Sequence, residues 1–142
     1  MRIGIEAQRL FRPQKHGMDI VALELIRAIQ RTDKQNEYFI FVKPDADNKC
    51  LEPSENVHIV KMPRANYALW EQVYLPRQVR KLGLDVLHCT ANTGPLSTDV
   101  PLVLTLHDMI FLENNPLARG ASASAYQRYG NLYRRWVVPP LM

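Results

Sequence analysis

The sequence predicts an α/β fold, with an open, mostly parallel sheet that helices cover on both faces. Apolar runs of strand length alternate with segments of helical periodicity in the order β-α-β-β-α-β-β-α. The stretch 101–113, PLVLTLHDMIFLE, is apolar up to the pair His107-Asp108, which is typical of a parallel strand buried on both faces. At 142 residues, 46% hydrophobic and 23% charged, the chain has the size and composition of one globular domain.

The first half of the chain is predicted to hold three strands and one helix. Residues 2–7 form a strand that begins almost at the N-terminus. A helix follows from about residue 18 to residue 32, because its apolar residues recur every three or four positions. Those on its main face are Met18, Val21, Ala22, Leu25 and Ile29. Residues 38–42 and 57–62 are the second and third strands, separated by a polar loop.

The second half is predicted to continue with a helix over residues 69–83, which contains Pro76. Proline lacks an N–H and clashes with the preceding turn, so Pro76 must begin a new turn or kink the helix. Gly83 is a suitable C-terminal stop. Residues 84–89 form the fourth strand, and the stretch 101–113 supplies the fifth. A last helix covers roughly residues 122 to 138.

The net charge of +4 belongs entirely to the C-terminal segment. Residues 1–113 hold fourteen basic and fourteen acidic residues, whereas residues 114–142 hold four arginines and no acid. One side of the predicted last helix carries Tyr126, Tyr129, Tyr133, Trp136 and Val137. Such a helix could contact an acidic lipid surface or nucleic acid. The favoured interpretation is a helix packed on the domain through this stripe, with its arginines in water.

Several classes of protein are not indicated. No apolar run is long enough to span a membrane, and the N-terminus lacks the apolar core of a signal peptide, so the cytoplasm is the default location. Cys50 and Cys89 form no CxxC pair and are expected to be unbridged thiols. The four histidines are scattered without metal-ligand spacing, so no metal site is expected.

A candidate site is predicted where the first, fourth and fifth strands end. In an open α/β sheet the ligand crevice lies outside the carboxyl ends of the strands. If these three strands are central neighbours in the sheet, the polar residues after them share one rim. These residues are Gln8, Arg9, Thr90, Asn92, Thr93, His107 and Asp108. The loop before the first helix, with His16, Gly17 and Met18, reaches this rim from the side.

The rim residues have both functional and structural interpretations. His107 could handle a proton, because the pKa of histidine is close to physiological pH, or it could merely close the strand. Asp108 could orient His107, although capping of the next turn is slightly favoured. Asn92 and Thr93 suit sugar or phosphate contacts and are equally good turn formers. Gly17 could admit an anion to the helix N-terminus or could serve turn geometry alone.

Six segments occur in an order that is seen in one large family. They are MRIGIEAQRL, HGMDIVALELIRAIQ, NEYFIFV, LWEQVYLPRQ, DVLHCTANTGPL and VPLVLTLHDMIFLE. In these segments the chain resembles the N-terminal domain of retaining glycosyltransferases with the GT-B fold, of the family 4 or group 1 type. The resemblance implies a Rossmann-like domain, one half of a GT-B fold. Residues 1–142 would be the acceptor-side domain, which faces a nucleotide-sugar-binding domain that this sequence does not contain.

The resemblance also implies a function and assigns roles to the rim. His107 matches the histidine of the family's HD motif, which lies beside the transferred sugar, and Asp108 matches its neighbour. The loop His16-Gly17-Met18 matches a glycine loop that approaches the donor phosphates. The implied reaction moves a sugar from a nucleotide-sugar donor to a saccharide or lipid-linked acceptor. The nucleotide-sugar is a co-substrate, so neither a cofactor nor a metal is expected, and the domain alone is expected to be inactive.

Other interpretations of the chain stay open. It could be a free-standing α/β ligand-binding or interaction module without catalysis. Surface left by a missing partner domain could drive homo-oligomer formation through the aromatic helix. Peripheral contact with a membrane is compatible with the basic C-terminal segment, whereas no nucleic-acid partner is expected.

Overall fold

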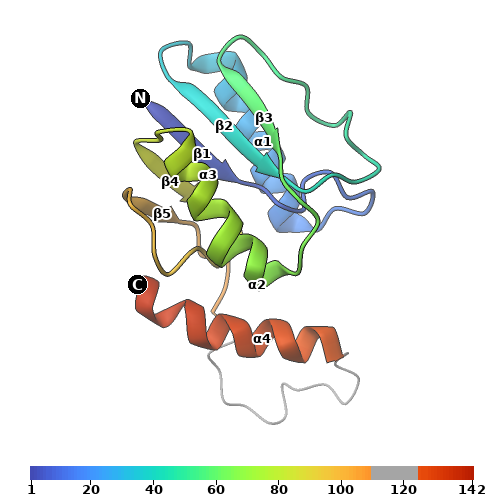
Figure 1. Ribbon diagram of the computed structural model, residues 1–142. Coiled ribbons are helices and arrows are strands. Elements are labelled where there is room, and N and C mark those ends of the chain that lie inside the picture. The colour runs from blue at the N-terminus through green and yellow to red at the C-terminus, as the bar shows by residue number, and fades with distance from the viewer. Residues whose placement is uncertain (110–124) are drawn as a thin grey trace.

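The computed structural model of the protein describes residues 1–109 and 125–142, and in this part it confirms the predicted α/β fold. The five strands form one sheet in the order β3-β2-β1-β4-β5, and every pairing is parallel (Figure 1). The strands are β1 (Arg2–Glu6), β2 (Glu37–Val42), β3 (Val57–Lys61), β4 (Val86–Cys89) and β5 (Leu102–Leu104). The first, fourth and fifth strands are neighbours, as the predicted shared rim requires, although β5 is an edge strand and not a central one.

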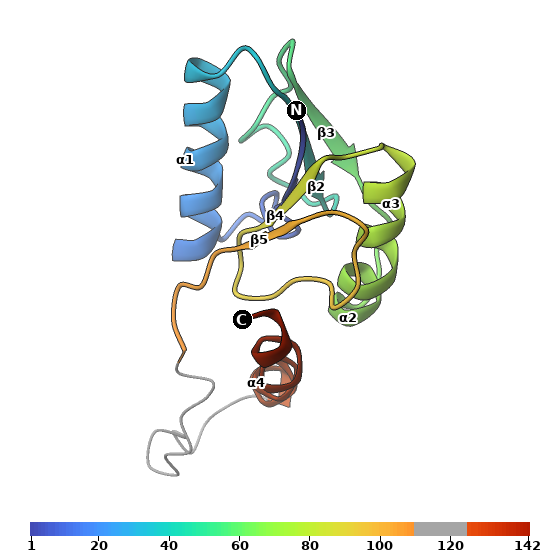
Figure 2. The same ribbon diagram turned by 90° about the vertical axis from the view of Figure 1, so that its left-hand side faces the viewer.

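Helices cover both faces of the sheet. Helix α1 (Gly17–Thr32) packs on one face, and α3 (Leu75–Lys81) packs on the other (Figure 2). Successive residues of β2 point to opposite faces, so Ile40 joins the buried cluster under α1 while Phe41 joins the cluster under α3. This two-sided burial explains why β2 is apolar along nearly its whole length.

The predicted helix around Pro76 is divided into three segments. It begins two residues earlier than predicted, as α2 (Tyr67–Leu69), and continues through the π-helical turn η1 (Trp70–Tyr74) into α3. Within this turn the Leu75 N–H donates to the carbonyl of Trp70, five residues back. Pro76 lies in the first turn of α3, directly after the π-helical turn, so the predicted new turn is confirmed. Gly83 follows the helix with a φ of +58°, as a left-handed stop.

The fifth strand differs from its prediction. β5 has only three residues and lies at the edge of the sheet, and Val103 within it is 49% exposed. The expectation of a strand buried on both faces is therefore wrong, because Leu102 and Leu104 pack against the cluster under α3 while Val103, on the opposite face, is left half exposed. Backbone pairing continues briefly past the strand, since the Thr105 N–H donates to the Cys89 carbonyl at 2.9 Å. The end of the predicted stretch, residues 110–113, lies outside the described residues.

The last helix, α4 (Ala125–Val137), lies across the carboxyl edge of the sheet (Figures 1 and 2). Residues 122–124 of its predicted span, and the side chain of Tyr126, lie outside the described part. Tyr133 is half-buried and Val137 is buried, which agrees with the predicted packing on the domain. Trp136 is 73% exposed, so the aromatic stripe does not pack as one face and the prediction is wrong there. The chain then closes with a 3-10 turn, η3 (Pro139–Leu141).

Three further findings concern the described residues. None of the helices in the described part is long and apolar enough to cross a membrane. Within residues 1–109 and 125–142, no group of three or more His, Cys, Asp or Glu side chains could hold a metal ion. Cys50 and Cys89 are free thiols.

Candidate functional site

The loop after β4 holds His107 in place at the rim of the sheet. The Nε2 of His107 lies 2.8 Å from the carbonyl oxygen of Thr90, and its backbone N–H donates to the side-chain oxygen of Asn92 at 2.5 Å. A carbonyl can only accept, so Nε2 carries the proton in this arrangement. Nδ1 is then the ring nitrogen that can accept a hydrogen bond or a proton. Thr90 is itself anchored, because its hydroxyl donates to the Glu6 carbonyl at 2.8 Å.

Asn92 forms the turn that positions this histidine. It is buried and has a φ of +64°, a left-handed conformation that asparagine tolerates better than most residues. Its N–H donates to the Thr105 carbonyl at 3.1 Å, and its side-chain oxygen is occupied by His107. Asp108 is exposed, and no hydrogen bond joins it to His107 among the described residues. The bonds that fix His107 therefore come from Thr90 and Asn92.

A buried carboxylate neutralises the start of α1. The N-cap residue His16 donates its backbone N–H to Asp19 at 2.8 Å. Asp19 is buried and pairs with Arg9 at 3.5 Å and with Arg12 at 2.9 Å. Gly17 is exposed, and a Cβ atom added there would meet no other atom within 4 Å. Nothing in the described structure therefore requires a glycine at this position. This finding does not support the interpretation that Gly17 serves turn geometry alone.

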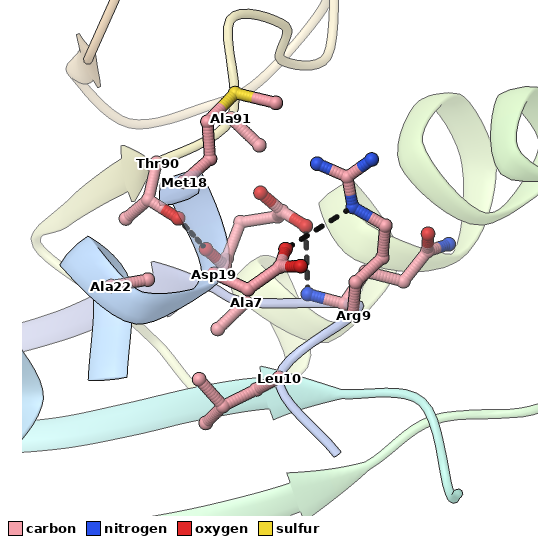
Figure 3. A pocket seen from close by; sticks show the side chains of 10 residues that line it. Ala7, Arg9, Leu10, Met18, Asp19, Ala22, Thr90 and Ala91 are labelled. Atoms are coloured by element: carbon pink, nitrogen blue, oxygen red, sulfur yellow. Dashed lines mark hydrogen bonds and ion pairs between the residues drawn. The ribbon is translucent and has the colours of Figure 1, made fainter. Parts of the chain in front are cut away.

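A small cavity lies between the end of β1 and the start of α1 (Figure 3). It brings together four of the predicted residues: Gln8, Arg9, Met18 and Thr90. Its volume is about 10 Å³, which is roughly the space that one water molecule requires. Glu6 also lines it, although its side chain is almost fully buried.

The buried carboxyl group of Glu6 has few hydrogen bonds to offset its loss of contact with water. One carboxyl oxygen accepts the backbone N–H of Gln8 at 2.9 Å, and the other has no hydrogen-bond partner. Burial raises the pKa of Glu6 to about 7, although the hydrogen bond from Gln8 acts in the opposite direction. This carboxyl group therefore exchanges its proton near neutral pH.

A larger cleft of about 400 Å³ opens beside the small cavity and shares Gln8 and Arg9 with it. Its walls come from the ends of β1 and β2, the start of α2, the loop after β4, and α4. The lining residues are Gln8, Arg9, Lys43, Ala65, Asn66, Tyr67, Ala91, Thr93, Tyr129, Gly130, Tyr133 and Arg134. Of the predicted rim residues, Gln8, Arg9 and Thr93 line this cleft, and His107 lines neither cavity.

A buried carboxylate, Glu71, organises one wall of the cleft. The hydroxyls of Thr93 and Tyr133 donate to its two oxygens at 2.6 Å each, and Gln72 Nε2 donates at 3.1 Å. The hydroxyls of Tyr67 and Thr93 are 2.6 Å apart. Burial raises the pKa of Glu71, and the hydrogen bonds from Thr93 and Tyr133 lower it. This network ties α4 to the π-helical turn and orients two tyrosines that face the cleft.

The sequence analysis did not single out Lys43, Tyr67, Glu71 or Arg134. Lys43 follows a parallel strand, so the rule applied to the other strand ends would have indicated it. Glu71 is a carboxylate within an otherwise apolar helical face, a pattern that marks a paired or functional group. Arg134 gave no such signal, because its position depends on where α4 packs.

An open parallel sheet with a polar cleft at its carboxyl edge defines a Rossmann-like α/β domain. Residues 16–140 match the model of the family described as Glycosyltransferase Family 4. The protein therefore belongs to glycosyltransferase family 4, as an N-terminal domain of the GT-B type, and glycosyl transfer is its general function. Neither a curated protein nor a solved structure matches the chain.

Proposed function

We propose that residues 1–142 form the acceptor-side domain of an enzyme that moves a sugar from a nucleotide-sugar to a saccharide or lipid-linked acceptor. The family match over residues 16–140 carries this proposal. A second Rossmann-like domain would hold the donor nucleotide and face the carboxyl edge of the sheet. Reading the coding sequence on both sides of these residues tests this arrangement.

In the proposed reaction, the sugar leaves its nucleotide diphosphate through an oxocarbenium-like transition state. The protein then has to position the substrates and to stabilise developing charge, without itself supplying a nucleophile. The exposed ring of His107, fixed by Thr90 and Asn92, supports a contact with the transferred sugar. Asp108 is adjacent and exposed, and we assign it a supporting contact in the same subsite.

We assign the start of α1 to the donor side. Gly17 is open to solvent, so a phosphate could approach the helix N-terminus without a steric conflict. His16 and Met18 flank this position, and Arg9 adds a positive charge beside it. The carboxylate of Asp19 accepts the N–H of His16 and brings a negative charge to the helix N-terminus. The positive charge of Arg9 is therefore needed for this end of the helix to attract an anion.

The histidine assignment is tested by His107→Ala in the two-domain enzyme. We expect turnover to fall by about 100-fold or more, because an oriented polar contact to the reacting sugar is lost. His58→Ala is the matched control, since His58 is a partly exposed histidine on β3, at the opposite edge of the sheet. Near-normal turnover of folded His107→Ala would remove His107 from the site.

The proposed separation of acceptor and donor binding between two domains is tested by offering a panel of nucleotide-sugars to the 142-residue protein. We expect no transfer from this chain alone and transfer once the donor-binding domain is present. Transfer by residues 1–142 alone would contradict the proposed two-domain arrangement.

A second candidate function is that of an interaction module, and the outer face of α4 favours it. Leu132 and Trp136 are both more than half exposed on this helix and line neither cavity, which is apolar surface that a partner could cover. We propose a second copy of this chain as that partner. Light scattering should then give a mass above that of the monomer, and Trp136→Ser should restore the monomer. A monomer at high concentration in the wild type would exclude this candidate.

A further inference from the structure

We propose that the acceptor bound in the larger cleft is anionic, with a phosphate or carboxylate group attached to a sugar. This inference rests on the proposed assignment of the domain to the acceptor. The cleft measures about 400 Å³, within the range of about 300–1,000 Å³ that is usual for small-molecule sites.

The charge of the cleft is the first argument. Arg9, Lys43 and Arg134 line it, and no Asp or Glu is among the described residues that do so. These three cations come from different elements: the turn after β1, the end of β2, and α4. Cations that converge on one cavity raise the local concentration of anions, and they bind phosphate and carboxylate oxygens through charge-assisted hydrogen bonds.

The second argument is that these cations are only partly neutralised within the protein. Among the described residues, Lys43 has no ion pair, and the side chain of Arg134 makes only a long hydrogen bond of 3.4 Å to Asn131. Arg9 shares Asp19 with Arg12, and its own ion pair with that carboxylate measures 3.5 Å. The positive charge facing the cleft is therefore available to a ligand.

The third argument is the set of rings beside the cations. Tyr67, Tyr129 and Tyr133 line the same cleft and offer flat apolar surfaces, which suit the C–H face of a sugar ring. The rings of Tyr67 and Tyr133 meet edge to face, with centroids 5.7 Å apart. The Glu71 network holds the Tyr133 hydroxyl directly and the Tyr67 hydroxyl through Thr93. Two rings are thus oriented before a ligand arrives, which lowers the entropic cost of binding.

The position of the cleft favours the acceptor over the donor as the source of this anion. The proposed donor loop at Gly17 leads to the small cavity, where Met18 is a lining residue. The larger cleft extends from Arg9 in the other direction, toward Lys43 and Tyr67. A donor diphosphate at the start of α1 would leave this cleft to the second substrate.

The experiment is a titration of the 142-residue protein, followed by NMR chemical shifts, with four probes: glucose 1-phosphate, glucuronate, glucose and UDP. We expect at least one of the two charged sugars to bind about tenfold or more tightly than glucose, because a neutral sugar leaves the three cations unpaired. The ratio between glucose 1-phosphate and glucuronate distinguishes a phosphate from a carboxylate as the anionic group. The affected resonances should include those of Thr93 and Tyr133.

Lys43→Met should lower the affinity for the more tightly bound charged sugar by about five- to tenfold. Lys49→Met removes an exposed lysine of the same loop and should leave this affinity unchanged. Both are surface changes, and circular dichroism checks their folding. Glucose binding as tightly as both charged sugars would overturn the inference. UDP binding with the same dependence on Lys43 would also overturn it, by assigning the cleft to the donor.

These outcomes are distinguishable from failure of the proposed function. Transfer of sugar by the two-domain enzyme, without selective binding of charged sugars, would reject the anionic acceptor alone. Selective binding that depends on Lys43, without any transfer, would reject the enzymatic proposal and leave an anionic-sugar site.

Discussion

Glu6 and Glu71 are two buried carboxylates near the same edge of the sheet, and their surroundings differ. Glu71 accepts hydrogen bonds from Thr93, Tyr133 and Gln72, which occupy both of its oxygens. Glu6 accepts one backbone N–H from Gln8, and its second oxygen has no partner. Both side chains are almost completely removed from solvent.

The difference shows that burial alone does not decide what a carboxyl group does. Burial raises the pKa of both groups, and donated hydrogen bonds oppose this by stabilising the ionised form. Glu71, with three donors, serves as a structural acceptor that joins α4 to the domain. Glu6, with few donors, titrates near pH 7 beside the small cavity. Three predictions sharpen this contrast.

The largest expected effect is that of Glu71→Ala. We expect the free energy of unfolding to fall by roughly 3–5 kcal/mol, because the change leaves several buried donors without an acceptor. Urea denaturation measures this loss. Glu71→Gln keeps one carbonyl acceptor and should lose about 1–2 kcal/mol. Equal, small losses in both variants would show that the network contributes little.

The second expected effect is the pH dependence caused by Glu6. Its pKa is raised in the folded state, so the native protein binds the proton more tightly than the unfolded chain does. Its contribution to stability is therefore complete below the ordinary pKa of 4.5 and is lost as pH rises to about 7. The expected loss is roughly 3 kcal/mol in the free energy of unfolding.

Glu6→Gln isolates this contribution, because glutamine stays neutral and can still accept the Gln8 N–H. The variant should resemble the wild type near pH 4 and exceed it in stability at pH 8. Chemical denaturation at both values provides the comparison. A difference between the two proteins that stays constant with pH would show that Glu6 does not titrate in this window.

The smallest expected effect is that of Tyr133→Phe. The loss of one hydroxyl that bridges Glu71 and Gln72 should cost about 1 kcal/mol in stability. It should also speed hydrogen exchange of the α4 amides, because the attachment of this helix is weakened. Tyr129→Phe is the matched control, since this exposed tyrosine is on the same helix. Unchanged exchange in Tyr133→Phe would mean that apolar contacts alone hold α4.

The alternation of strands and helices and the position of the rim could be predicted because they depend on local patterns. Parallel strands are read from apolar runs, and their carboxyl ends share an edge, which places Thr90 beside His107. The short length of β5 and its place at the edge of the sheet could not be predicted in this way, because an edge strand and a central strand have similar apolar runs. Val103 is apolar and yet half exposed for this reason.

The sequence by itself determined the alternation of strands and helices, the turn at Pro76 and the residues that end each strand. Only the tertiary structure decided how the cleft is walled and charged. Glu71 is hydrogen-bonded to Thr93, 22 residues away in the sequence, and to Tyr133, 62 residues away. Arg134 reaches the cleft only because α4 packs over the sheet edge. Periodicity reports which side of an element is buried, whereas such contacts depend on where the chain returns in space.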